Sequence, residues 1–232
     1  MIKIMLVEDD PILARIILYY LQQEGFYEVE WVKTAGEALA IARHPFDVIL
    51  LDVKLPDVSG IDLCQKLREW HSCPIIFISC LDDSDTIIRA LEMGGDDFVT
   101  KPFDNKVLAA RIHANLRRNR SLPTDQPVNQ LICNSFSLDM RSQTVCREGI
   151  STPLSNMEFR VLSYLMQNPD RYISAEELYK KVWGKDSCGD VRTVMVHIHN
   201  IRKKIGEDKQ ALHVRCVWGK GYYFDPKGTQ EN

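Results

Sequence analysis

Three short, mostly apolar runs constrain the fold of this chain most strongly. They are IKIMLV at 2–7, DVILLD at 47–52 and PIIFIS at 74–79. Such runs are typical of strands that are buried on both faces of a sheet. Pro11 to Glu24 lie between the first two runs, with apolar residues at helical spacing, namely Ile12, Ile16, Ile17 and Leu21. This alternation predicts an α/β doubly wound parallel sheet of five strands, with helices on both faces.

The pattern changes after a polar segment that contains two prolines and lacks periodicity, as a linker does. Short alternating segments from Leu131 to Leu154 then predict a small antiparallel sheet. Three helical patterns follow at about 156–167, 174–183 and 190–205, and a hairpin is expected around Gly219 and Gly221. We therefore predict a domain at 1–119, a linker at 120–129 and an α+β domain at 130–228.

Charge is divided unevenly between these two halves. Residues 1–119 carry 13 Lys and Arg against 19 Asp and Glu, a net charge of −6, whereas residues 120–232 carry 16 against 13, a net charge of +3. The basic half is therefore expected to bind a polyanion.

Composition also indicates the compartment. Seven cysteines are scattered without a CxxC pair, which favours reduced thiols over a disulfide framework or a metal site. No run of eighteen apolar residues is present, and the N-terminus lacks a cleavable signal. We expect a cytoplasmic protein with no membrane partner.

Five polar residues stand at the carboxyl ends of the predicted strands: Glu8, Asp9, Asp52, Ser79 and Lys101. In an open parallel sheet these ends meet at one edge, where sites form. Each residue alone has a common structural explanation, such as a helix cap or a surface charge, and only their joint placement indicates a site. Clustered carboxylates with oxygen ligands favour Mg²⁺.

This set of groups also predicts a reaction. A carboxylate can attack phosphorus and form an aspartyl phosphate, and Asp52 ends the central strand. Mg²⁺, Lys101 and the Ser79 hydroxyl would then stabilise the phosphoryl oxygens. The Lys101-Pro102 step offers a cis peptide bond that would direct the lysine inward.

The 190–205 helix has two stripes at about 100° per residue. One is apolar, with Val194, Ile198, Ile201 and Ile205, and the other holds Thr193, His197, Asn200 and Lys204, flanked by Arg192 and Lys203. No acid occurs from Val191 to Gly206. A cationic face suits the major groove of DNA, where Asn bonds adenine, although a solvated bundle helix would have the same pattern. Val196 and the hairpin at 213–224 are further candidate contacts.

Residues 1–119 resemble the receiver domain of bacterial two-component response regulators, which has a flavodoxin-like fold. The matching motifs are V-E-D-D (7–10), L-L-D-V-x-L-P-D-x-S-G (50–60), F-I-S (77–79) and G-G-D-D-F-V-T-K-P-F (94–103). The resemblance implies that Asp52 is the phosphoacceptor, and that Asp9, Asp52 and the Lys54 carbonyl bind Mg²⁺, with Glu8 acting through water. It also implies that Ser79 and Phe98 are the switch pair. We expect the Cys80 thiol, beside Ser79, to be packed rather than reactive.

Residues 130–226 resemble the winged-helix effector domain of the OmpR/PhoB family. The matching motifs are L-S-x-x-E-F (154–159), S-A-E-E-L-Y-x-x-V-W-G (174–184), V-R-T-V-x-V-H-I (191–198), I-R-K-K-I (201–205) and G-x-G-Y (219–222). The resemblance implies a helix-turn-helix, a wing in the minor groove, and a loop at 183–190 that contacts RNA polymerase. Trp218 and Asn200 stand where Arg is frequent, and Lys220 is a second candidate at the wing.

The family resemblance also implies a homodimer on phosphorylation, formed by the fourth helix, fifth strand and fifth helix of the receiver. The expected contact residues are Ile87, Leu91, Glu92, Asp96, Asp97, Val107, Arg111, His113 and Arg118. Cross-subunit ion pairs are expected from Asp96, Asp97, Arg111 and Arg118. Two of the usual charged pairs are replaced in this chain, one by Ile87 with Val107 and the other by Glu92 with His113.

The sequence therefore predicts a DNA-binding transcriptional response regulator that receives a phosphoryl group from a cognate sensor histidine kinase and binds promoter DNA. It would be a stoichiometric phosphoacceptor rather than an enzyme. A phosphatase of the haloacid dehalogenase type also uses a nucleophilic Asp, but it needs an acid where Lys54 stands. A regulator that works without phosphorylation is the other alternative, although no pocket residue is missing.

Overall fold

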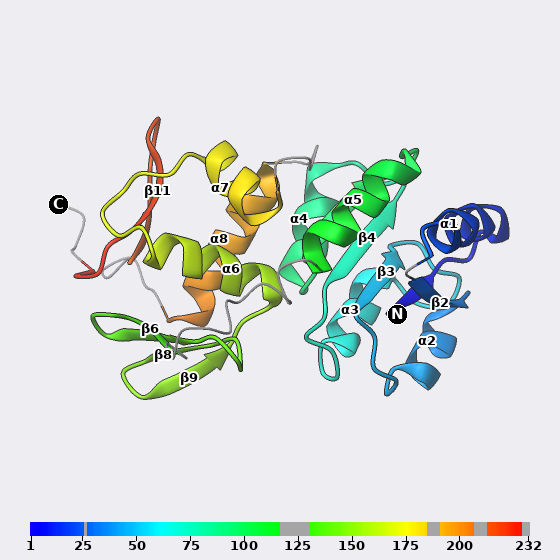
Figure 1. Ribbon diagram of the computed structural model, residues 1–232, viewed down its shortest axis with the longest axis horizontal. Coiled ribbons are helices and arrows are strands. Elements are labelled where there is room, and N and C mark those ends of the chain that lie inside the picture. Colours follow the sequence, from blue (N-terminus) through cyan, green and yellow to red (C-terminus); the bar gives the residue numbers. More distant parts are fainter. Residues whose placement is uncertain (26, 117–129, 185–190, 207–212, 229–232) are drawn as a thin grey trace. The chain divides into compact units, whose positions relative to one another are not determined.

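The structure is a computed structural model that describes residues 1–25, 27–116, 130–184, 191–206 and 213–228. The chain forms two compact units, one made mainly of residues 1–121 and the other of the remaining chain (Figure 1). The predicted linker at 120–129 lies outside the described residues, so its bounds remain a prediction. Among the described residues, no helix combines the length and apolar character needed to cross a bilayer.

The first unit alternates strands and helices. Its elements are β1 (Ile2–Val7), α1 (Pro11–Gln23), β2 (Tyr27–Val32), α2 (Ala35–Ile41), β3 (Val48–Asp52), α3 (Gly60–Leu67), β4 (Ile75–Ser79), α4 (Ser84–Glu92), β5 (Asp97–Thr100) and α5 (Asn105–Leu116). All strand pairs are parallel, in the order β2-β1-β3-β4-β5. The predicted doubly wound five-stranded sheet is confirmed.

Both faces of this sheet are buried, which explains the continuous apolar runs. Alternate residues of the central strands, such as Leu6, Leu50 and Ile78, form one core with α1 and α5. The residues between them, such as Leu51 and Phe77, are buried on the other face. Because successive side chains of a strand point to opposite faces, neither face tolerates polar residues.

Helix starts in this unit are set by side chains that accept hydrogen bonds from backbone N–H groups. Asp10 caps α1 by accepting from Ile12, 2.8 Å away, and Pro11 occupies the first turn, where it is tolerated. Thr34, Ser59 and Asp83 cap α2, α3 and α4 in the same way. The loops that follow β1, β3 and β4 are therefore held at defined positions.

The second unit has the predicted order of a small sheet, three helices and a hairpin. Its elements are β6 (Gln130–Cys133), β7 (Phe136–Asp139), β8 (Thr144–Arg147), β9 (Ile150–Pro153), α6 (Asn156–Met166), α7 (Ala175–Val182), α8 (Arg192–Lys204), β10 (Val214–Val217) and β11 (Gly221–Phe224). The strands β6 to β9 form an antiparallel sheet in sequence order. The winged-helix architecture that the sequence predicts is confirmed.

One core holds the second unit together. It joins Phe136 and Phe224 of two separate sheets to the apolar sides of α6, α7 and α8. Ser155 and Glu158 form a capping box at the start of α6, in which each side chain bonds the backbone N–H of the other residue. The ring of Trp183, at the end of α7, is stacked on the ring of Tyr179, and the two ring centroids are 4.9 Å apart.

Candidate functional site

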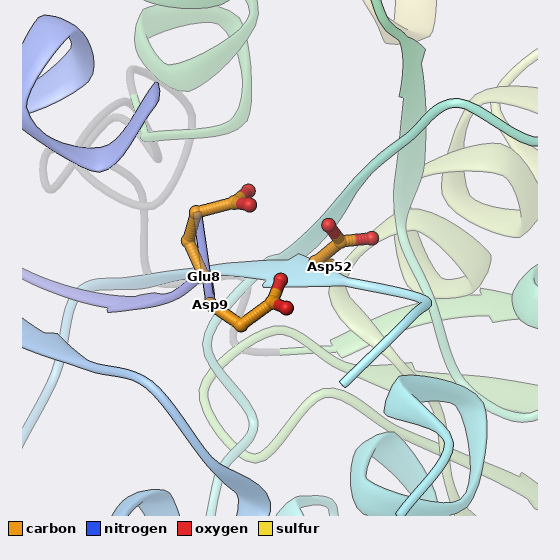
Figure 2. Close-up of side chains that lie close together, drawn as sticks. All are labelled: Glu8, Asp9 and Asp52. Carbon is orange, nitrogen blue, oxygen red and sulfur yellow. The ribbon is translucent and has the colours of Figure 1, made fainter. Parts of the chain in front are cut away.

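Three carboxylates meet at the carboxyl ends of β1 and β3. Glu8 and Asp9 follow β1, and Asp52 is the last residue of β3, which pairs directly with β1. Oxygens of the three side chains lie within 4.8 Å of one another (Figure 2). Glu8 and Asp52 are buried, and Asp9 is exposed. We name Glu8, Asp9 and Asp52 the acidic cluster.

Lys101, which follows β5, reaches this acidic cluster. Its Nζ lies 2.5 Å from Asp52 Oδ2 and 2.8 Å from Glu8 Oε2. The Lys101 backbone N–H donates to the Ser79 carbonyl oxygen at 2.7 Å, which fixes the end of β5 beside β4. The Lys101–Pro102 peptide bond is cis, as expected.

The pKa values of Glu8 and Lys101 reflect crowding of charge at this point. The pKa of Glu8 is raised to about 7, mainly by burial and also by the neighbouring Asp52, while the Lys101 ammonium opposes the change. Burial lowers the pKa of Lys101, but its hydrogen bonds to Asp52 and Glu8 outweigh this effect and raise it. One ammonium thus faces three carboxylates, which is an arrangement that a hard divalent cation would neutralise.

Residues around Asp52 hold it in position. One Asp52 oxygen accepts from the Lys54 backbone N–H at 3.0 Å, while the other contacts Lys101. The loop after β3 returns so closely that a Cβ on Gly60 would lie 1.8 Å from the Asp52 carbonyl oxygen. Position 60 therefore requires glycine, which the sequence interpretation left without a role.

Two further residues of the site escaped the sequence interpretation. Asp57 accepts hydrogen bonds from the backbone N–H groups of Ala35 and Gly36, at 3.0 and 2.9 Å, and these bonds lower its pKa. Trp31 Nε1 donates to the Glu8 carbonyl oxygen at 2.8 Å. Both contacts join segments far apart in sequence, and only the acidic, glycine-containing motif around 57–60 gave any signal.

The predicted switch residues both lie in the interior of the unit. Ser79 is buried at the end of β4, and its Oγ accepts from the Leu81 backbone N–H at 3.2 Å. Phe98 of β5 is paired with Phe77 of β4, with ring centroids 6.1 Å apart. Cys80 is exposed, so the expectation that its thiol is packed is wrong. The chain leaves the sheet after Ser79, and residue 80 faces outward there.

Two acids expected to form cross-subunit ion pairs instead bind cations of their own chain. Asp97 lies 2.6 Å from Arg111, and both side chains are buried. Asp96 pairs with Arg68 and also accepts from the Ile75 backbone N–H at 2.9 Å. A cation of the same chain is already within reach of each acid, so in this structure neither acid is available to a partner subunit.

The rest of the predicted dimer surface is mixed in exposure. His113 Nε2 lies 2.9 Å from the Tyr27 hydroxyl of the same chain, and its pairing with Glu92 across subunits stays a prediction. Ile87 and Leu91 are buried, whereas Glu92 is exposed and Val107 is partly buried. Arg118 lies outside the described residues.

Helix α8 does not present the stripe that the sequence predicts. Thr193, Val196, His197 and Asn200 are all buried, and the accessible residues are Arg192, Met195, His199, Lys203 and Lys204. The His197 ring lies 5.5 Å from that of Trp183. The reason is that α8 packs against both α6 and α7, so its buried side is wider than one apolar stripe.

The cations near the end of α8 have different surroundings. Lys204 Nζ lies 2.6 Å from Glu158 Oε2, the carboxylate of the α6 capping box. Arg202 Nε donates to the Val214 carbonyl oxygen at 2.7 Å, which ties α8 to β10. Lys203 is exposed. Lys204 therefore has a structural contact that its position in the sequence did not reveal.

The hairpin of β10 and β11 carries the predicted wing residues at its turn. Trp218 is 98% exposed, and Lys220 Nζ lies 5.2 Å from the centre of the Tyr172 ring. The predicted polymerase loop falls largely at 185–190, outside the described residues.

Both halves of the chain match known protein families. Residues 4–113 match the response regulator receiver domain, and residues 149–224 match the family described as transcriptional regulatory protein, C terminal. The first match contains the acidic cluster and Lys101, and the second contains α6 to α8 and the hairpin.

Curated relatives match over nearly the whole chain. An uncharacterized transcriptional regulatory protein, YclJ, of Bacillus subtilis (strain 168) is 37% identical, covering 96% of this chain and 99% of its own. The sensory transduction protein RegX3 of Mycolicibacterium smegmatis is also 37% identical, covering 97% and 100%. The transcriptional regulatory protein KdpE of Mycobacterium tuberculosis is 33% identical, with the same coverage.

Solved structures agree with the sequence relatives. A mutant form of the protein RitR aligns with a TM-score of 0.76 at 26% identity, covering 97% of this chain and 99% of that one. The response regulator DrrB of Thermotoga maritima, described as an OmpR/PhoB homolog, aligns with a TM-score of 0.52 at 30% identity and the same coverage. With a receiver half, a winged-helix half and full-length relatives, this chain belongs to the OmpR/PhoB family of two-component transcriptional response regulators.

Proposed function

We propose that Asp52 accepts a phosphoryl group from a cognate sensor histidine kinase, and that the phosphorylated protein dimerises and binds promoter DNA. The observation that carries this proposal is the position of Asp52, at the end of β3 and 2.5 Å from the Lys101 ammonium. No other acid of the cluster ends a strand of the sheet centre. A protein that receives phosphate from a kinase and binds a promoter works in the cytoplasm.

The transfer replaces one bond to phosphorus with another. A carboxylate oxygen of Asp52 forms the O–P bond, and the P–N bond of the kinase phosphohistidine breaks, so that imidazole is the leaving group. Lys101 then turns from the Asp52 carboxylate to the phosphoryl oxygens and offsets their charge. The Ser79 hydroxyl, at the end of the neighbouring strand, donates to another of these oxygens and gives up its present contact with Leu81.

The acidic cluster fits Mg²⁺. Glu8, Asp9, Asp52 and the Lys54 backbone carbonyl are oxygen ligands only, as a hard cation requires. One lysine does not neutralise three carboxylates, and the pKa of Glu8 is raised by its burial and, to a smaller extent, by the charge of Asp52. Bound Mg²⁺ would neutralise charge on the phosphoryl oxygens.

The protein is a stoichiometric acceptor in this scheme rather than a phosphatase. A haloacid dehalogenase-type enzyme needs an acid two residues after the nucleophile, and this chain has Lys54 there.

The proposed surface for the kinase is on α1, which closely follows Glu8 and Asp9. Ile12, Ile16 and Tyr19 lie on one side of this helix and are 71, 47 and 68% exposed. An apolar stripe of this kind suits the side of a partner helix.

The change at Asp52 is proposed to reach the dimer surface through Ser79 and Phe98, which lie on the adjacent strands β4 and β5. Movement of Ser79 toward the phosphoryl group opens space that the Phe98 ring can enter. Dimerisation by α4, β5 and α5 then requires that Asp97 and Arg111 exchange their internal ion pair for one across the subunits.

DNA binding is proposed for α8 and the hairpin. Arg192, His199 and Lys203 are accessible basic residues of α8 and suit phosphates, whereas the accessible Lys204 is paired with Glu158. Asn200 remains our candidate for base contacts, and its 8% exposure means that binding must uncover it. The segment at 183–190 is proposed to contact RNA polymerase.

The central experiment uses acetyl phosphate with Mg²⁺ and intact-protein mass spectrometry. Wild type should gain one phosphoryl mass, and Asp52→Asn should gain none. Asp62→Asn, which removes a half-exposed acid of α3 outside the cluster, is the matched control and should label normally. Chelation of Mg²⁺ should stop labelling, because the carboxylates then repel the phosphate. Labelling of Asp52→Asn at the wild-type level contradicts the proposal.

A further inference from the structure

The tip of the β10–β11 hairpin carries a tryptophan in place of a cation. Trp218 is 98% exposed, whereas the other tryptophan with a large exposed fraction in the described chain, Trp70, is 48% exposed. An indole of this size gains nothing from complete exposure to water, since its burial elsewhere would be favourable. Exposed aromatic side chains on a basic surface are typical of contacts with nucleic acid bases.

The turn holds Trp218 away from the domain in a defined direction. The Lys220 backbone N–H donates to the Val217 carbonyl oxygen at 3.0 Å, which closes a four-residue turn with Trp218 as its second residue. Gly219 follows with φ of +75°, in the left-handed region that suits the third residue of such a turn. The indole therefore projects from a tight turn rather than from a long loop.

The base of the hairpin is fixed to the domain. Ile173 and Tyr222 exchange two backbone hydrogen bonds of 2.8 Å. A Cβ on Gly221 would lie 2.2 Å from the Ile173 carbonyl oxygen, so glycine is required for this approach. Because the hairpin cannot pivot freely, a side chain at its tip keeps its orientation when it meets a ligand.

The cations of the hairpin are held back from its tip. Lys220 Nζ lies 5.2 Å from the Tyr172 ring, and the Arg215 guanidinium lies 5.8 Å from the Tyr223 ring. The two rings are themselves 4.9 Å apart. Arg215 also forms an ion pair with Asp225 at 3.6 Å, so Lys220 is the hairpin cation that suits a phosphate beside the groove. The apolar indole extends beyond this lysine. No acid occurs at 213–224, and the next residue, Asp225, is buried.

We infer that Trp218 is an apolar wedge that enters the minor groove of duplex DNA and partly unstacks one base step, bending the duplex. This inference rests on the proposed DNA-binding function and deepens it. A wedge favours steps that unstack easily, such as TA and CA/TG, so Trp218 would select sequence through the deformability of DNA rather than through hydrogen bonds. Arginine at this position would instead be attracted to the negative potential of a narrow groove.

The probe for the test is a duplex enriched from a random-sequence pool by the phosphorylated full-length protein. 2-Aminopurine, whose fluorescence rises on unstacking, replaces one base at a time in that duplex. Wild type should raise the fluorescence at one step, and Trp218→Ala should abolish the rise and weaken binding about tenfold without changing the salt slope. Trp218→Phe should retain most of the signal. Trp70→Ala is the matched control and should behave as wild type.

The variant Trp218→Arg distinguishes insertion of an apolar side chain from an electrostatic contact with the groove. This variant should regain affinity with a salt slope steeper by about one, yet give no fluorescence rise. The wedge is overturned if wild type binds its enriched duplex with no rise at any step, or if Trp218→Ala keeps the wild-type rise. Failure of wild type to prefer the enriched duplex over a scrambled one would instead overturn the DNA-binding function itself.

Discussion

Cys64 and Cys80 carry the same side chain, but burial makes the reactivity of their thiols different. Burial raises the pKa of the Cys64 thiol to about 12, whereas Cys80 is exposed at the end of β4. The thiolate is the reactive form, so at neutral pH a raised pKa leaves almost none of it. Iodoacetamide at about pH 7.5 should therefore alkylate Cys80 in the native protein and leave Cys64 unmodified until urea is added. Peptide mass spectrometry measures both sites, and equal native rates would contradict the assignment.

At the scale of elements, the two neighbouring lysines of α8 have separate roles. Lys204 contacts Glu158, a buried carboxylate that also accepts from the Ser155 backbone N–H at 2.7 Å. Lys204→Ala should lower the free energy of unfolding by about 1–2 kcal/mol. The reason is that the Glu158 carboxylate keeps its bond from the Ser155 backbone N–H but loses its ion pair with Lys204. Urea titration measures this change. Lys203→Ala, the matched variant at an exposed position, should change stability by less than about 0.5 kcal/mol.

DNA binding distinguishes the same pair of lysines. Lys203→Ala should flatten the salt dependence of binding by about one unit, since a phosphate contact is lost. Lys204→Ala should flatten it less, because its ammonium is already engaged by Glu158. Binding to cognate and scrambled duplexes across a salt series provides the comparison. If Lys204→Ala flattens the salt dependence more than Lys203→Ala does, then Lys204 leaves Glu158 and contacts a phosphate when DNA binds.

At the scale of the whole molecule, the proposed dimer depends on Asp97 and Arg111, which pair within one chain in the structure. Asp97→Arg and Arg111→Asp each place like charges together and should prevent dimerisation of the phosphorylated protein. Mixed in equal amounts, the two variants should dimerise, because opposite charges meet only across the two different chains. Sedimentation of each variant and of the mixture, after circular dichroism confirms folding, tests this. Monomers in the folded mixture would mean that the ion pair works only within a chain.

The sequence alone predicted the sheet and the acidic cluster, because both depend on local patterns. Strands buried on two faces must be continuously apolar, so their ends were visible and Glu8, Asp9, Asp52 and Lys101 could be assigned to one edge. The residues that hold this edge in place were not predicted. Asp57 and Trp31 act through backbone groups of distant segments, and no spacing within the sequence encodes those contacts.

Tertiary structure alone decided the partners of the charged and polar side chains. Asp96 with Arg68, His113 with Tyr27, and Lys204 with Glu158 are each separated by many residues in sequence. The same holds for the accessible side of α8, which depends on two other helices. Hydrophobic periodicity is a property of one segment, whereas an ion pair depends on a distance of a few ångströms between two segments, which only the folded chain determines.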